Sequence, residues 1–165
     1  MIAIKNILVA TDFGEAADSA LSYGRELAAR FGATLHVLNV VENFYVTTFG
    51  AETYTAFVPD MQREIENAAR TRLDEALIDS DGSGPATKGV VMSSGSAPYA
   101  IVDYASENSI DLIVMGTHGR GALAHLMMGS VAERVVRIAP CPVLTVRHPE
   151  HEFIQPDALV AVMKA

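Results

Sequence analysis

Short apolar runs rich in β-branched residues alternate along this chain with longer stretches whose apolar residues recur every three or four positions. The short runs predict buried strands, and the longer stretches predict amphipathic helices. Strands are expected at Ile2–Ala10, Thr34–Val41, Thr87–Met92, Asp111–Met115 and Val143–Arg147. Helices are expected from near Gly14 to Phe31, over Asp60–Ile78, from Ser96 to about Glu107, and over Ser130–Ile138. Such alternation is typical of an α/β fold whose parallel sheet is covered on both faces.

The segments between these elements carry turn and cap residues. Gly32 stands where a helix C-terminus favours a left-handed residue, and Asp60 is expected to cap the helix that it begins. The stretch Glu42–Pro59 has no regular period and is expected to be a long connection. We therefore expect one domain over residues 1–147 and a tail over 148–165, in which Pro156–Met163 is predicted to form a short helix.

Composition narrows the class of protein. The chain has 165 residues, of which 50% are hydrophobic and 19% charged, which suits one domain with strands buried on both faces. The formal net charge of −8 disfavours nucleic acid and anionic membranes as partners. Met1–Asn6 lacks the features of a signal peptide, and no apolar run is long enough to span a bilayer, so we expect a cytoplasmic protein.

The most informative motif is Gly116-Thr117-His118-Gly119, followed after nine residues by Gly129-Ser130. It lies between a predicted strand and a predicted helix. Glycines there let main-chain N–H groups approach an anion, and the helix N-terminus adds unpaired donors and partial positive charge. The motif thus predicts a phosphate site without a lysine. An ordinary glycine-rich loop is the alternative, with Ser130 and Glu133 forming a capping box that needs no ligand.

Three polar side chains near these loops are candidates for ligand contacts. Asp12, which follows Thr11 at the end of the first strand, either accepts hydrogen bonds from ribose hydroxyls or caps the next helix. Arg120 is able to pair with a phosphate through its guanidinium fork. His118 belongs to the same loop, where we expect a solvated or supporting group and not a catalytic base.

Several familiar catalytic and metal-binding patterns are absent from the sequence. There is no G-x4-G-K-[ST] loop, and no G-x-G-x-x-G follows the first strand. No Cys and His spacing predicts a zinc site, and no nucleophile and base can be paired from their spacing. The one cysteine, Cys141, is expected to be buried and not reactive. We therefore predict neither a catalytic residue nor a metal ligand.

Over about Lys5 to Arg147, the chain resembles the universal stress protein family in four blocks of sequence. The spacing G-x2-G-x9-G-S is similar to the ATP-binding motif of that family. The matching blocks are Ile7–Asp12, Asp111–Gly121, Gly129–Glu133 and Cys141–Val146. The resemblance implies a Rossmann-like, open five-stranded parallel sheet of order 3-2-1-4-5 with helices on both faces. It also implies an adenine nucleotide, ATP with or without Mg²⁺, in a crevice at the carboxyl ends of strands one and four.

The resemblance also assigns roles to individual residues. It places Asp12 and Gly116 at the ribose, and Thr11, Met115 and the backbone of Val40 around the adenine. The residues that it places at the phosphates are Gly119, Arg120, Gly129, Ser130 and Val131. Family members usually form homodimers through the last strand, here Val143–Arg147.

The main functional expectation is a stress-response module whose conformation or oligomeric state depends on bound ATP. One alternative is an enzyme of the same superfamily, a slow ATPase or a nucleotidyl transferase. Another is an interaction module that keeps the fold but does not use nucleotide. The sequence does not separate ATP from AMP or a cyclic nucleotide.

Overall fold

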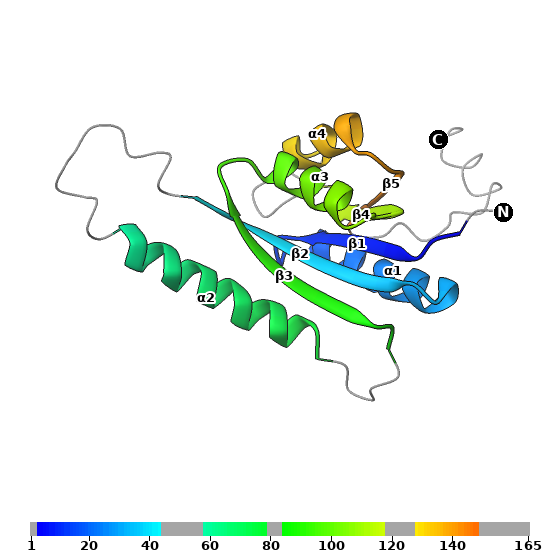
Figure 1. Ribbon diagram of the computed structural model, residues 1–165, viewed down its shortest axis with the longest axis horizontal. Coiled ribbons are helices and arrows are strands. Elements are labelled where there is room, and N and C mark those ends of the chain that lie inside the picture. Colours follow the sequence, from blue (N-terminus) through cyan, green and yellow to red (C-terminus); the bar gives the residue numbers. More distant parts are fainter. Residues whose placement is uncertain (1–2, 44–57, 79–83, 118–127, 149–165) are drawn as a thin grey trace, which may run out of the picture.

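The computed structural model describes residues 3–43, 58–78, 84–117 and 128–148. Its five strands form one parallel sheet in the order β3-β2-β1-β4-β5, which confirms the predicted fold (Figure 1). The strands are β1 (Asn6–Thr11), β2 (Thr34–Glu42), β3 (Thr87–Ser94), β4 (Leu112–Gly116) and β5 (Val143–Val146). The helices are α1 (Glu15–Phe31), α2 (Val58–Ala76), α3 (Ala97–Glu107) and α4 (Ser130–Ile138).

Most differences from the predicted elements lie at their ends. Helix α2 begins at Val58, so Asp60 lies inside its first turn and pairs with Arg63, and its predicted role as the cap is wrong. Gly32 adopts a φ of +62° at the end of α1, as predicted. Most of the connection predicted between Glu42 and Pro59, and the predicted helix Pro156–Met163, lie outside the described residues.

Two helices cover each face of the sheet (Figure 1). On one face, α1 and α2 pack on a core that includes Ile7, Val9 and Leu73. On the other face, α3 and α4 pack on a core that includes Leu8 and Ile113. Successive residues of β1 thus enter opposite cores, which explains why this strand is apolar without alternation.

The start of β1 is fixed to the start of β4 by one carboxylate. Asp111 Oδ2 accepts the main-chain N–H groups of Lys5 at 2.7 Å and of Asn6 at 2.9 Å. These two bonds stabilise the charged form and hold the pKa of Asp111 below its ordinary value. The two strands therefore start in a fixed register, with Ile7 opposite Leu112.

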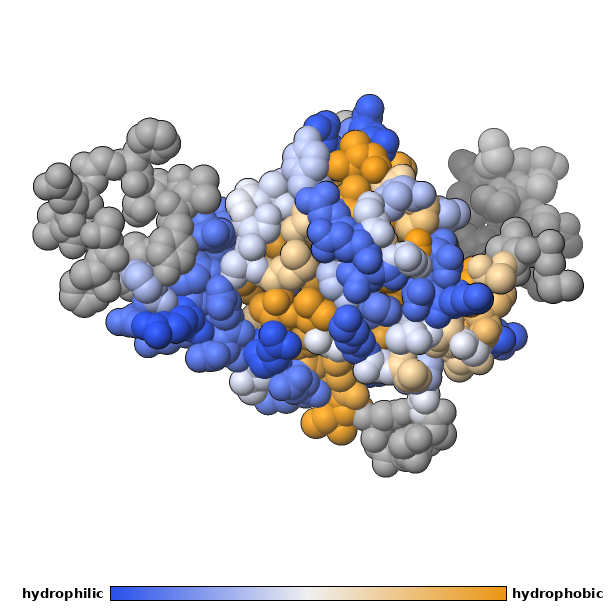
Figure 2. All heavy atoms as spheres, in the orientation of Figure 1, coloured by the Kyte–Doolittle hydropathy of each residue, from blue (hydrophilic) through white to orange (hydrophobic). Residues whose placement is uncertain are grey.

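The edge strand β3 is the least covered part of the sheet. None of its residues is fully buried, and Figure 2 shows apolar surface over this strand between the polar residues of α2 and α3. An edge strand that lacks a neighbour on one side keeps part of its apolar surface in solvent.

Within the described residues, no helix is both long and apolar enough to cross a membrane.

A histidine and a tyrosine form a buried polar pair between the sheet and α3. His36 Nδ1 lies 2.8 Å from the Tyr104 hydroxyl, and the two rings meet edge to face. Burial, together with the nearby charge of Lys88, lowers the pKa of His36 below its ordinary value of 6.5. Burial also raises the pKa of Tyr104. Both side chains are therefore neutral in the folded protein near pH 7.

This pair predicts a loss of stability in mild acid. As the pH falls below about 6.5, the unfolded chain takes up a proton at His36 before the folded chain does, so the free energy of unfolding decreases. In His36→Gln, which does not titrate, we expect a smaller decrease between pH 7 and pH 5. Urea unfolding at several pH values measures this difference. Equal decreases in both proteins would show that His36 does not couple folding to protons.

Candidate functional site

One cavity lies at the carboxyl ends of the two central strands. The registers place Ala10 of β1 beside Met115 of β4, and β2 continues on the far side of β1, so the strand order reverses here. Ligands of open parallel sheets bind at this reversal point. The cavity has a volume of about 440 Å³ and is bordered by the ends of β1, β2 and β4 and by the first turns of α1, α3 and α4.

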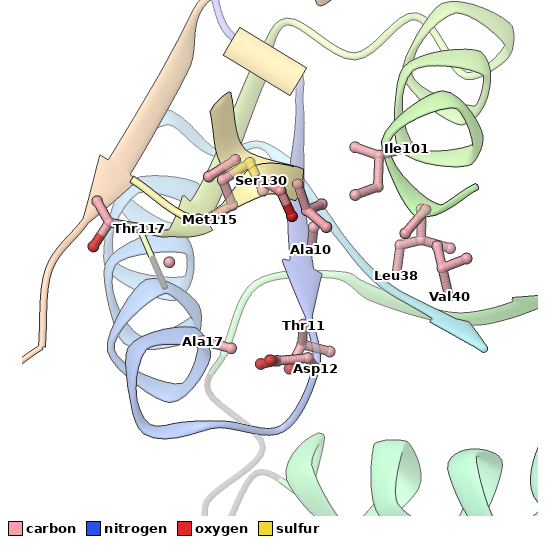
Figure 3. A pocket seen from close by; sticks show the side chains of 15 residues that line it. Ala10, Thr11, Asp12, Ala17, Leu38, Val40, Ile101, Met115, Thr117 and Ser130 are labelled. Atoms are coloured by element: carbon pink, nitrogen blue, oxygen red, sulfur yellow. The ribbon is translucent and has the colours of Figure 1, made fainter. Parts of the chain in front are cut away.

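The cavity has an apolar side and a polar end (Figure 3). Leu38, Val40 and Ile101 lie together on one side of it. Polar groups come from the ends of the strands and the start of α4, and these residues are Thr11, Asp12, Thr117 and Ser130. Such a cavity suits a ligand with one apolar part and one polar or charged part.

The turn between β1 and α1 is held by two hydrogen bonds from main-chain N–H groups to side-chain oxygens. Thr11 Oγ1 accepts the N–H of Phe13, and Asp12 Oδ1 accepts the N–H of Gly14, each at 3.0 Å. The residue before the first turn of α1 is Gly14, which makes no side-chain cap. Of the two alternatives for Asp12, the helix cap is therefore wrong, because its carboxylate closes the turn before the helix begins.

Phe13 occupies an unusual backbone conformation in the same turn. Its φ is +61°, in the left-handed region that a bulky residue seldom adopts. The ring packs against the core under α1, and the Arg72 guanidinium of α2 lies 4.7 Å from its centre. Strain of this kind persists when surrounding contacts fix the backbone, and it is concentrated at functional sites.

Beneath this turn lies a buried amide that sequence reasoning missed. Asn39 of β2 is 5% exposed, and its Nδ2 donates to the carbonyl oxygen of Thr11 at 2.8 Å. Its Oδ1 has no hydrogen-bond partner among the described residues. An unsatisfied buried acceptor costs roughly 1–3 kcal/mol. The available signal was that Asn39 is the one polar residue between Val37 and Val41.

Gly116 ends β4 where the strand packs tightly against α1. A Cβ at this position would lie 2.8 Å from the Ala16 Cβ and 2.9 Å from the Ala16 carbonyl carbon. Close packing against Ala16 therefore explains the need for a glycine at this position without a ligand. It also lines the cavity, so the close approach of α1 brings the end of β4 next to the turn that carries Asp12.

The start of α4 forms the other border of the cavity. Gly129 precedes the helix, and its N–H donates to the Thr117 carbonyl at 2.6 Å. Ser130 is the first helical residue and Glu133 pairs with Arg137, so the predicted capping box does not form. The main-chain N–H groups of the first helical turn have no acceptor within the helix, and Ser130 and Val131 border the cavity.

The structure brings most of the predicted site residues to this one cavity. These are Thr11, Asp12, Val40, Met115, Gly116, Gly129, Ser130 and Val131. His118, Gly119 and Arg120 lie outside the described residues. Cys141 is partly buried, and burial raises the pKa of its thiol, which disfavours the reactive thiolate.

Comparison with known proteins identifies the family. The model of the universal stress protein family matches residues 3–147. The chain belongs to the universal stress protein family. One relative is the Thermus aquaticus protein named "Universal stress protein in QAH/OAS sulfhydrylase 3′region". It is 34% identical over 143 residues, which are 87% of this chain and 98% of that relative.

Solved structures of universal stress proteins have the same fold. UspA from Lactobacillus plantarum superposes with a TM-score of 0.71 at 28% identity, over 89% of this chain and all of that one. The Archaeoglobus fulgidus protein in complex with dAMP superposes with a TM-score of 0.61 at 23% identity, over 88% and 99% of the two chains.

In this universal stress protein, Gly116 offers a direct test of how the cavity is built. Replacement by alanine forces β4 and α1 apart, and we expect the free energy of unfolding to fall by about 1–3 kcal/mol. Chemical denaturation measures the loss. The double variant Gly116→Ala/Ala16→Gly should recover only part of it, because two of the three nearest atoms belong to the Ala16 backbone. Full recovery would contradict a backbone clash.

Proposed function

We propose that this universal stress protein binds ATP in the cavity at the ends of β1 and β4 and acts as a stress-response sensor. The observation that carries the proposal is that an apolar wall, a carboxylate and a helix N-terminus border one cavity. These features match, in order, the base, the ribose and the phosphates of a nucleotide. In Archaeoglobus fulgidus the fold accommodates dAMP, an adenine nucleotide.

The adenine ring occupies the apolar side of the cavity in this proposal. Leu38, Val40 and Ile101 supply one wall, and Met115 lies at the end of β4. The ring buries its faces against these side chains, while its edge bonds to the backbone of Val40. A volume of about 440 Å³ lies within the range of roughly 300–1,000 Å³ that is common for small-molecule sites.

The ribose and the phosphates extend toward the polar end. Asp12 accepts hydrogen bonds from the ribose hydroxyls, next to Gly116. The phosphates lie at the N-terminus of α4, where Ser130 and Val131 offer main-chain N–H groups. Gly129 contributes space and not a donor, since its N–H is bonded to Thr117. We further propose that His118, Gly119 and Arg120 complete the phosphate loop, with or without Mg²⁺.

Titration calorimetry with ATP tests the site, with Gly129→Glu as the disruptive variant. A carboxylate about 4 Å from a phosphate costs about 4 kcal/mol at an effective dielectric constant of 20, so ATP affinity should fall about 1,000-fold. Gly84→Glu is the matched control, because it adds the same charge at the exposed loop before β3, at the opposite ends of the strands. Unchanged affinity in a folded Gly129→Glu protein would exclude this site.

We also propose a homodimer formed through β5. Ile113 N–H bonds to the Pro142 carbonyl and Thr117 N–H to the Val146 carbonyl, so the main-chain groups of Val143 and Thr145 point to the open edge. Thr117 also accepts the Gly129 N–H. A continuous main-chain path therefore joins the phosphate-binding turn to the dimer edge. This path gives bound ATP a physical route to the oligomeric state.

The proposed dimer can be tested by removing one main-chain donor. Thr145→Pro deletes an N–H on the open edge and should give a monomer in multi-angle light scattering. Thr145→Val keeps that N–H, and we expect it to remain a dimer. If both variants assemble as the unmodified protein does, β5 is not the interface.

A further inference from the structure

Asn39 bonds to one peptide group at the proposed site. Its Nδ2 donates to the Thr11 carbonyl at 2.8 Å, and that carbonyl belongs to the peptide bond that joins Thr11 to Asp12. Thr11 is the last residue of β1 that pairs with β2, and its partner in the register is Asn39. The Asn39 amide therefore adds a side-chain donor at the point where the β1–β2 ladder ends. Rotation of this peptide would move Asp12 directly.

The peptide bond on the other side of Asp12 is also fixed. Phe13 N–H donates to Thr11 Oγ1, and the left-handed backbone of Phe13 turns the chain toward α1. The packed ring of Phe13, with Arg72 over its face, prevents this turn from relaxing. Asp12 thus lies between two fixed peptide planes, and its Oδ1 is held by the Gly14 N–H.

Core stability alone does not explain the amide of Asn39. The side chain is buried, and its Oδ1 finds no hydrogen-bond partner in the described part of the chain. An apolar side chain of similar size would avoid this unsatisfied acceptor. What the amide contributes is the bond to the Thr11 carbonyl. Because the amide carries the cost of an unsatisfied Oδ1, its bond to the Thr11 carbonyl indicates a role in holding the β1–α1 turn.

We propose that Asn39 is a positioning residue, which sets the Asp12 carboxylate for the ribose hydroxyls of the bound nucleotide. This inference rests on the proposed function. Asn39 lies on the α2 side of β2, whereas its neighbours Leu38 and Val40 border the cavity, so it acts through the β1–α1 turn and not by contact with the ligand. It therefore affects the part of the affinity that depends on ribose hydroxyls.

The test compares ATP with 2′,3′-dideoxy-ATP, which lacks the hydroxyls that Asp12 would bind. In Asn39→Leu we expect ATP affinity to fall about 10-fold to 100-fold, the loss expected for hydrogen bonds to a charged group. The affinity for dideoxy-ATP should change by less than about twofold. Asn108→Ala is the matched control, because Asn108 Nδ2 also donates to a main-chain carbonyl, that of Tyr104 in α3, and does not border the cavity.

A second comparison tests whether Asn39 acts through Asp12. In an Asp12→Ala background, Asn39→Leu should cause no further loss of ATP affinity, because the group that it positions is gone. Asn39→Asp, which keeps the size of the side chain but replaces the donor by an acceptor, should reproduce the effect if Asn39→Leu does not fold.

The outcomes separate this inference from the proposed function. If the unmodified protein binds neither nucleotide, the proposed site is wrong and the role of Asn39 falls with it. If the unmodified protein binds ATP but Asn39→Leu and Asn39→Asp weaken both nucleotides equally, Asn39 is merely structural and the inference is overturned. Additive losses with Asp12→Ala would overturn it as well.

Discussion

The parallel pairing of β1 with β4 is the constraint on which the rest of this domain depends. At the amino end, the Asp111 carboxylate ties the start of β1 to β4 through two main-chain bonds. At the carboxyl end, Gly116 lets α1 approach β4 closely. Between these ends the apolar residues of both strands enter the cores on the two faces. With both ends fixed, the turn after β1 and the start of α4 border one cavity.

The architecture and the strand ends that border the cavity followed from local patterns. Buried parallel strands leave continuous apolar runs, and Leu112–Met115 is such a run, so strands of this kind were visible in the sequence. The order of the strands came from the family resemblance, because periodicity does not say which strands are neighbours. The start of α4 was also visible, since Gly129 and Ser130 precede a stretch of strong helical period.

The features that could not be predicted from the sequence depend on contacts between distant segments. Ser130 and Glu133 have the spacing of a capping box, but the N–H of Gly129 bonds to the Thr117 carbonyl, and the helix begins at Ser130, one residue earlier than that motif requires. Gly116 fits the motif for a phosphate loop, yet a Cβ there would first meet the Cβ and the carbonyl group of Ala16. Asn39 had no motif at all. Its contact with the Thr11 carbonyl depends on the pairing of β1 with β2, which a local pattern does not predict.

A chain with a net charge of −8 is an unfavourable long-range partner for an anion, and the cavity itself includes the Asp12 carboxylate. Two effects make a nucleotide site compatible with this charge. Exposed charges more than about 8–10 Å away are largely screened at physiological salt, so the distant acidic residues contribute little. Main-chain donors at a helix N-terminus act at contact distance, where each bond to a charged group contributes roughly 1.5–3 kcal/mol. The short-range term therefore outweighs the long-range one, provided that the carboxylate stays at the ribose and away from the phosphates. The fixed turn around Asp12 meets that condition, because Gly14 and Thr11 hold it at the end of β1 while the phosphates would lie at α4.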